Sequence, residues 1–162
     1  MKEEKNLKTN FYINEFKTLK SYVEEEYRKI GSIDNPALKT KIFFNSNGLH
    51  HLKYDNNRSE RSKTIQKNKF MFFSDAVAII KKSSTTQEYR RIFYTSNKTK
   101  ELKMIEFFAF WAIISFTKKI RIKVVIKRVG GEDGKFNFWS VMPFWQLNKN
   151  GRMIGSENIE NE

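Results

Sequence analysis

The chain has 162 residues, no cysteine, and a formal charge of +13 from 31 Lys and Arg against 18 Asp and Glu. This length fits one domain, and the aromatic content of 15% argues against a disordered chain. The lack of Cys excludes disulfides, zinc knuckles, iron–sulfur clusters and catalysis by a thiol.

Membrane and export signals are missing from the pattern. The longest apolar run, residues 107–114, is far shorter than the roughly 20 residues that span a bilayer. The charged N-terminus is not followed by an apolar run of the kind seen in secretory signals. The sequence therefore predicts a cytoplasmic protein that does not enter a membrane.

The positive charge is concentrated in the middle of the chain. Residues 41–128 carry 20 basic and 6 acidic side chains, whereas residues 1–40 carry 8 and 7, and residues 129–162 carry 3 and 5. Because the excess lies in the body and not in a terminal tail, the natural partner of such a surface is a polyanion such as RNA or DNA.

The first half of the chain has helical periodicity. Apolar residues recur at helical spacing across residues 10–30, which predicts a helix that ends at Gly31. Residues 32–40 have the composition of a connector, and residues 41–44 form a short strand or a helical turn. Two further helices are predicted, one capped by Ser59 and one over residues 74–82 capped by Ser74.

The second half has the pattern of a sheet. Four strands joined by short turns are predicted over residues 89–96, 102–115, 120–129 and 135–145. In the third strand the side chains alternate, with Ile120, Ile122, Val124 and Ile126 on one face and Arg121, Lys123, Val125 and Lys127 on the other. The predicted fold class is α+β, with N-terminal helices packed on one face of a four-stranded antiparallel sheet.

This pattern also suggests how the chain is divided. We expect an N-terminal helical extension over residues 1–40, a basic α+β domain with a nuclease-like layout over residues 41–148, and a mobile polar tail over residues 149–162. The apolar run of Phe107, Phe108, Phe110 and Trp111 is expected in the core.

Motifs for metal and nucleotide chemistry are missing. The six carboxylates of residues 41–128 include no closely spaced pair, so a two-metal site is not expected. His50 and His51 are adjacent, and adjacent side chains rarely converge on one zinc ion. No phosphate-binding GxxxxGK[ST] loop occurs either. The sequence predicts neither a metal nor another cofactor.

The remaining side chains suit metal-free cleavage of RNA, in which the ribose 2′-hydroxyl attacks the neighbouring phosphate. This reaction needs a base, an acid and cations, and histidine is best matched to neutral pH. The candidate catalytic residues are His50, His51, Lys53, Tyr54 and Arg61. The candidate nucleic-acid-binding residues are Arg58, Lys63, Lys67, Arg121, Lys123, Lys127, Trp139 and Ser140.

Each of these residues also has a structural interpretation. A histidine in a helical turn is more often structural than catalytic, lysine-rich stretches are usually solvated, and Trp139 fits a core position better than a stacking platform. Two other functions therefore stay open. One is a module that binds RNA or DNA without cleaving it, and the other is a structural protein whose charge serves solubility.

Two segments, GLHHLKYDNNRSERSK and IRIKVVIKRVGGEDGKFNFWSVMPFW, give residues 41–147 a layout that resembles a group of RNA-cleaving domains. The group includes barnase-like, EndoU-like, RelE-like and colicin-type tRNase toxins, and related domains encoded by phages and mobile elements. The resemblance implies helices followed by a four-stranded antiparallel sheet, and an endoribonuclease that acts as a toxin or phage-related effector. By charge complementarity, an acidic inhibitor protein would be a fitting partner.

The chain departs from the group in its proton-transfer residues. Barnase-like members use a glutamate base, and no glutamate of this chain stands out in that role. RelE-like members without histidine use Lys, Arg and Tyr instead. The acid and the base are therefore not assigned by the resemblance.

Overall fold

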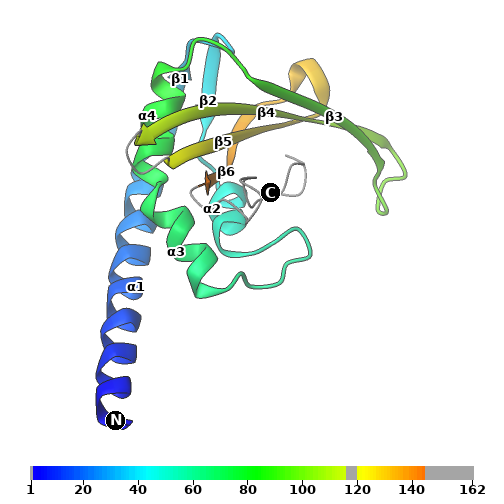
Figure 1. Ribbon diagram of the computed structural model, residues 1–162. Helices are drawn as coiled ribbons and strands as arrows, with labels where there is room; N and C mark the ends of the chain where they lie inside the picture. The colour runs from blue at the N-terminus through cyan, green and yellow to red at the C-terminus, as the bar shows by residue number, and fades with distance from the viewer. Residues whose placement is uncertain (1, 116–119, 145–162) are drawn as a thin grey trace, which may run out of the picture.

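The computed structural model describes residues 2–115 and 120–144, and their side chains over residues 14–114 and 120–144. Helices and a curved sheet form the described part (Figure 1). The helices are α1 (Lys2–Ile30), α2 (Ser46–Lys53), α3 (Lys63–Met71) and α4 (Phe73–Lys82), with a 3-10 turn, η1, at Gly131–Asp133. The strands are β1 (Ser32–Asn35), β2 (Thr40–Phe43), β3 (Glu88–Thr95), β4 (Leu102–Ser115), β5 (Ile120–Val129) and β6 (Phe136–Phe144).

Helix α1 is longer than predicted, because it begins at Lys2 and not at residue 10. It ends where Gly31 takes a φ of 63°, a left-handed conformation that favours glycine. Phe16, Val23 and Tyr27 are buried on the face that packs on the body. The N-terminal half of α1 extends beyond the sheet (Figure 1).

The sheet has six strands in the order β1-β2-β6-β5-β4-β3, so the prediction of a four-stranded antiparallel sheet is wrong in detail. The four predicted strands are present and antiparallel, but β2 adds to β6 in parallel through Ile42 and Phe43. Helices and strands are combined as expected for an α+β fold.

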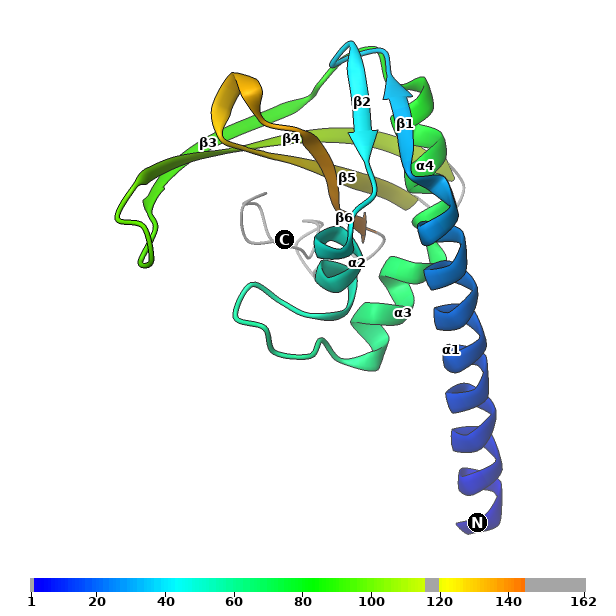
Figure 2. The same cartoon turned by 180° about the vertical axis from the view of Figure 1, so that it is seen from behind.

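Strand β1 lies in the segment that was predicted to be a connector. Its polar composition hid the strand, in which Asn35 is buried and its amide nitrogen and oxygen each make a hydrogen bond. Asn35 Nδ2 donates to the carbonyl oxygen of Ile80 at 2.7 Å, and Asn35 Oδ1 accepts from Leu38 N at 2.8 Å. These bonds hold β1 beside α4, as the view from behind shows (Figure 2).

Two predicted helix starts are wrong. Helix α3 begins at Lys63, with Ser62 and not Ser59 as its cap, because Tyr54 and Glu60 pair across a loop that keeps residues 55–59 out of the helix. Helix α4 begins at Phe73, and its cap residue Phe72 makes no side-chain capping bond. Burial of Phe73 in the core outweighs the preference for a serine cap at this position.

The two faces of β5 differ as predicted. Ile122, Val124 and Ile126 are buried in the main core with side chains of α1 and α4, and we name this side of the sheet the core face. On the other side, the second face, Val125 packs with Phe107 and Ala109 in a smaller apolar cluster. The register also places Trp111 on the second face, half-buried and outside both buried clusters, which corrects the core position expected for it.

A β-bulge interrupts the pairing of β5 with β6. Val125 pairs with Ser140 and Ile126 pairs with Phe138, so Trp139 is an extra residue without a partner on β5. A bulge of this kind re-aims a side chain and is frequent beside functional sites. Here it turns the Trp139 ring toward α2, where it stacks on His51.

Two predictions remain, one on membrane spans and one on the C-terminal tail. No helix in the described ranges, 2–115 and 120–144, is both long and apolar enough to cross a bilayer. The predicted polar tail, residues 149–162, lies outside the described residues.

Candidate active site

Helix α2 lies directly against β6, and two residues make this possible. The Asn45 side chain caps α2 by accepting from Gly48 N at 3.1 Å, and Asn45 Nδ2 donates to Asn137 Oδ1 at 2.8 Å. A Cβ atom on Gly48 would lie 2.3 Å from the carbonyl oxygen of Phe138, so any larger residue would push α2 off the strand. The close approach brings His51 against Trp139, and both histidines line the same cavity as Trp139.

His51 is buried in the wall of the site, with only 3% of it exposed. Its ring stacks on the Trp139 indole with centroids 4.1 Å apart. Burial, followed by the charges of Lys69, Arg61 and Lys127, lowers the pKa of His51 to about 2. His51 is therefore neutral at physiological pH and is not a proton donor in the free protein.

Arg61 is fixed by the C-terminal end of α2. Its Nε donates to the carbonyl oxygens of His51 and Tyr54 at 3.2 and 3.1 Å. Its Nη2 lies 3.3 Å from His51 Nε2, and because Arg61 is always a donor, that ring nitrogen is the acceptor. The neutral His51 ring therefore accepts a hydrogen bond from Arg61 and helps to orient the guanidinium.

His50 differs from its neighbour, because it is exposed. Its ring stacks on Tyr54 with centroids 4.3 Å apart and an angle of 15°. His50 opens onto a cavity of about 320 Å³ between α2, the following loop and the sheet. The cavity is lined by Asn47, His50, His51, Asp55, Asn56, Arg58, Lys127 and Trp139.

Lys127 enters this cavity from β5. Its Nζ lies 3.7 Å from the centroid of the Trp139 ring, close enough for a cation–π interaction. Burial lowers the pKa of Lys127 to about 8, so the ammonium is still charged at neutral pH but gives up its proton more readily than an exposed lysine. No ion pair joins Lys127 to a carboxylate among the described residues.

The loop after α2 is held by hydrogen bonds to Asp55 and brings Arg58 to the cavity. Asp55 Oδ1 accepts from Asn57 N and Ser59 N at 2.9 and 2.8 Å, and Asp55 N donates to the carbonyl oxygen of Ser59. Arg58 takes a φ of 63°, which an ordinary residue adopts only when its surroundings impose it. These hydrogen bonds define the conformation in which Arg58 reaches the cavity.

Ser140 does not reach the cavity, because its side chain is fully buried. Its Oγ accepts a hydrogen bond from Lys69 Nζ at 2.7 Å, and the same ammonium donates to the carbonyl oxygen of Val141 at 3.3 Å. Lys69 is 4% exposed. The pair ties α3 to the strand next to the bulge, and the Lys69 charge acts on His51.

The other predicted site residues lie elsewhere. Lys53 Nζ pairs with Glu24 of α1 at 2.9 Å, Lys67 lies 3.7 Å from Glu15 of α1, and Lys63 is exposed at the start of α3. Arg121 and Lys123 lie on the second face of the sheet, beside Trp111. The structure thus brings together His50, His51, Tyr54, Arg58, Arg61, Lys127 and Trp139.

Sequence reasoning missed four residues of this region. Asn47, Asp55 and Asn56 line the cavity, and no motif marked them. Lys69 had a signal that could have been used, because Gln66, Lys69 and Phe70 share the buried face of α3 at helical spacing. Among the described residues, no three His, Asp or Glu side chains are grouped closely enough to hold a metal ion.

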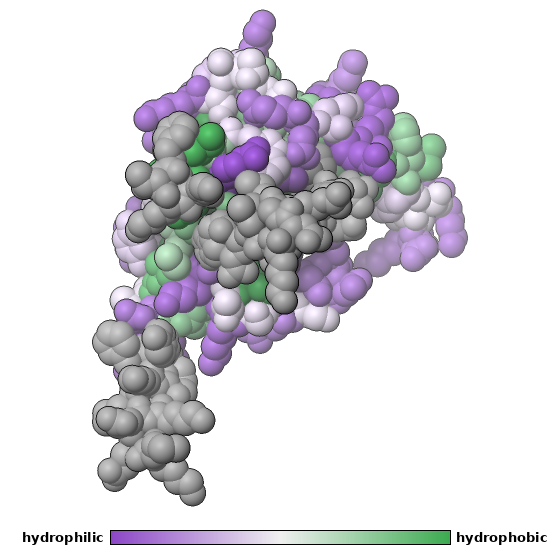
Figure 3. Space-filling model, in the orientation of Figure 1, coloured by the Kyte–Doolittle hydropathy of each residue, from purple (hydrophilic) through white to green (hydrophobic). Residues whose placement is uncertain are grey.

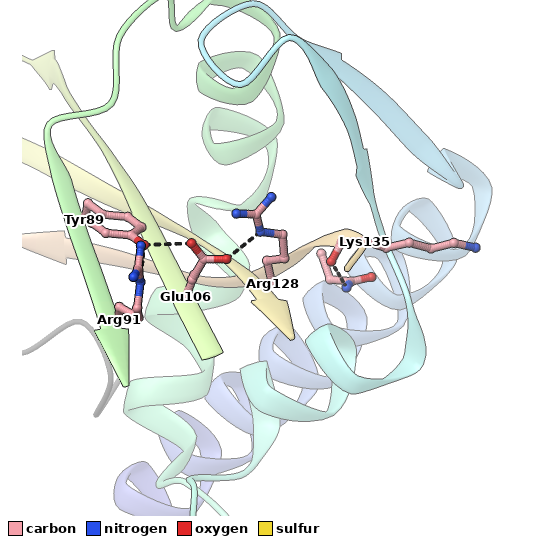
Figure 4. A network of polar contacts seen from close by, with 6 residues as sticks. Tyr89, Arg91, Glu106, Arg128 and Lys135 are labelled. Carbon is pink, nitrogen blue, oxygen red and sulfur yellow. Dashed lines mark hydrogen bonds and ion pairs between the residues drawn. The ribbon is translucent and has the colours of Figure 1, made fainter. Parts of the chain in front are cut away.

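A second polar network lies on the core face of the sheet, away from the cavity. Glu106 accepts from Arg128 Nε at 2.6 Å and from the Tyr89 hydroxyl at 2.7 Å, and Arg91 Nε donates to that hydroxyl at 3.0 Å (Figure 4). The hydrogen bond from Arg128 is the main reason that the pKa of Glu106 is lowered. With its charge satisfied, Glu106 stabilises the sheet and has no free role in the cavity.

We compared the chain with protein-family models, with curated proteins and with solved structures, and none of the three comparisons finds a match.

Proposed function

We propose that the chain is a metal-independent endoribonuclease whose active site is the cavity beside α2. The observation that carries the proposal is the set of groups lining this one cavity, namely the His50 imidazole, the Lys127 ammonium and the Arg58 guanidinium. Cleavage of RNA through its own 2′-hydroxyl needs one group to accept a proton, one to donate a proton, and cations to hold the phosphate.

Each group has a role that its surroundings support. His50 accepts the proton of the 2′-hydroxyl, and the 2′-oxygen then attacks phosphorus. Lys127, whose pKa is lowered to about 8, donates its proton to the leaving 5′-oxygen as the P–O5′ bond breaks. Arg58 binds the phosphate and stabilises the charge that develops on it. The products are a 2′,3′-cyclic phosphate and a 5′-hydroxyl.

His51 and Trp139 act through other residues in this proposal. The neutral His51 orients Arg61, and its stack on Trp139 closes the back of the cavity. Trp139 in turn supports the Lys127 ammonium. These residues are positioning residues. DNA, which has no 2′-hydroxyl, is expected to bind the cationic cavity without being cut.

The test is cleavage of single-stranded RNA by the purified chain in excess EDTA, with the ends of the products identified by mass spectrometry. His50→Ala and Lys127→Met should each lower the cleavage rate by about 10²-fold or more, the usual contribution of one acid or base. Lys98→Met, which removes an exposed charge from the turn between β3 and β4, should cleave like the unchanged chain. The proposal fails if RNA stays intact, or if both cavity variants cleave normally.

A non-catalytic RNA- or DNA-binding module is the second candidate. The observation in its favour is the burial of His51, the more enclosed of the two histidines, in a neutral form that serves structure. It predicts salt-sensitive binding of RNA without any product. In either case the net charge of +13 favours an acidic protein as an inhibitor or partner, and the cytoplasm, where RNA is abundant, as the place of action.

A further inference from the structure

The second face of the sheet carries another group of cations and aromatic rings, away from the cavity. Arg121 Cζ and Lys123 Nζ each lie 4.8 Å from the centroid of the Trp111 ring. We name Trp111, Arg121 and Lys123 the Trp111 cluster. Its members come from neighbouring strands, because Trp111 of β4 pairs directly with Lys123 of β5.

The Trp111 ring is held in one orientation. Its Nε1 donates to one carboxylate oxygen of Glu88, and Lys123 Nζ lies 3.4 Å from the other oxygen. Phe144 packs against the ring with centroids 4.9 Å apart. Lys123 is only 1% exposed, whereas Trp111 is half-buried and Arg121 is exposed. The accessible parts of the cluster are therefore an indole fixed in advance and a guanidinium beside it.

The Trp111 cluster and the cavity lie on the same face of the sheet. Lys123 and Lys127 are four residues apart on the same face of β5, which corresponds to about 13 Å along the strand. Between them Val125 and Ala109 are fully buried, so the Trp111 cluster and the cavity are two separate accessible sites on this face. Arg90 of the neighbouring strand β3 is exposed and belongs to the same face by its pairing with Phe107.

We propose that the Trp111 cluster is a second nucleotide subsite, on which a base of the substrate stacks while the phosphate to be cut lies in the cavity. This inference rests on the RNA-binding half of the proposed function. Rigid aromatic faces flanked by cations bind single strands with little sequence preference, because every base has a face that can stack. In a duplex the bases already stack on one another. The ligand class is therefore a single-stranded RNA of several nucleotides, not a mononucleotide or a duplex.

Binding of oligonucleotides that cannot be cleaved tests the inference separately from catalysis. The probes are labelled 2′-O-methyl RNAs of two and of eight nucleotides, and fluorescence anisotropy measures their Kd values. Trp111→Leu should weaken binding of the octanucleotide about tenfold, within the range measured for loss of one stacked base, and should leave binding of the dinucleotide unchanged. Phe93→Leu, which alters an exposed aromatic residue on the core side of β3, should change neither.

A second variant keeps the test valid if Trp111→Leu disturbs folding. Arg121→Gln changes an exposed side chain, and it should weaken the octanucleotide alone while lowering the slope of log Kd against log salt by about one. The inference is overturned if both variants bind the octanucleotide like the unchanged chain, or if Arg121→Gln weakens the dinucleotide equally. Binding that depends on Trp111 without cleavage of ordinary RNA would refute the nuclease and leave the subsite standing. Lack of binding by either probe would refute both.

Discussion

Lys123 and Lys127 lie on the same face of the same strand, yet their surroundings differ. Lys123 is almost fully buried, and its ammonium faces the Glu88 carboxylate at 3.4 Å. Lys127 is less buried and sits against the Trp139 ring, with no carboxylate partner among the described residues. A buried cation that has a counter-charge depends on it for the stability of the fold, whereas one without a counter-charge is available for a ligand or for proton transfer.

The variant Lys127→Met gives the strongest test of this difference between the two lysines. The change removes the proposed proton donor, so cleavage of RNA should fall by about 10²-fold or more. The free energy of unfolding should stay the same or rise, because a half-buried charge without a counter-charge is lost. Urea unfolding and cleavage assays on the same preparation measure both. A large loss of stability would mean that Lys127 is structural, like Lys123.

Glu88→Gln tests the other lysine. Glutamine keeps an oxygen that accepts from Trp111 Nε1 but leaves the Lys123 ammonium without its counter-charge. We expect the free energy of unfolding to fall by about 2 kcal/mol, less than for a fully buried pair because about a third of the Glu88 side chain is exposed. Urea denaturation gives the value. A cost near zero would show that Lys123 does not need its partner.

The pKa of Lys127 makes a prediction for the rate. Burial lowers this pKa from 10.5 to about 8, and the proposed donor works only when it is protonated. The cleavage rate should therefore fall above about pH 8, by up to tenfold for each further pH unit. A rate profile between pH 6 and pH 10 measures the position of the decline. A decline that begins only near pH 10 would contradict the role given to Lys127.

The lowered pKa of His51 makes a prediction for the free energy of unfolding at acidic pH. Its pKa is about 2 in the folded chain and near 6.5 in the unfolded chain, so the unfolded chain binds one more proton between these values. Stability should therefore decrease as the pH falls below about 6.5, by up to about 1.4 kcal/mol per unit. His51→Phe, which preserves a ring against Trp139, should remove this contribution. Equal pH slopes for the two proteins in urea denaturation would contradict it.

The parts of the fold that follow from local pattern were predictable. The alternation along β5 identified its two faces, and Gly31 marked the end of α1, because both depend on neighbouring residues alone. Strand β1 was missed because its buried Asn35 is satisfied by Ile80, a residue 45 positions away. Propensity carries no information on such a partner.

The candidate site was predictable in its residue types but not in its geometry. The pattern singled out His50 and His51 together and gave no reason to separate them. They differ because His51 stacks on Trp139 at the bulge, and because Gly48 lets α2 approach Phe138 closely. Both contacts join parts of the chain about 90 residues apart. Lys127 was recognised as a cation, but its lowered pKa depends on burial, which only the folded chain defines.

The β3–β4 hairpin at the far end of the sheet exposes apolar side chains, whereas the cavity is lined mainly by cationic and polar ones. Hydrophobic surface in the view of Figure 3 is limited to separate patches, one of them near the end of the projecting β3–β4 hairpin. Phe93 and Leu102 of this hairpin are 59% and 69% exposed. They lie away from the cavity, which makes Phe93 a suitable position for control substitutions in binding assays.

The pairing of β2 with β6 has a consequence for the time at which the cavity forms. One wall comes from α2 and its loop, and the other comes from β5 and β6, the last strands that the structure describes. A growing chain leaves the ribosome N-terminus first, so α2 emerges long before its strand partner is made. On the proposed function, the chain would therefore have no complete site during most of its own synthesis, and the messenger being translated would not be cut before β6 is made.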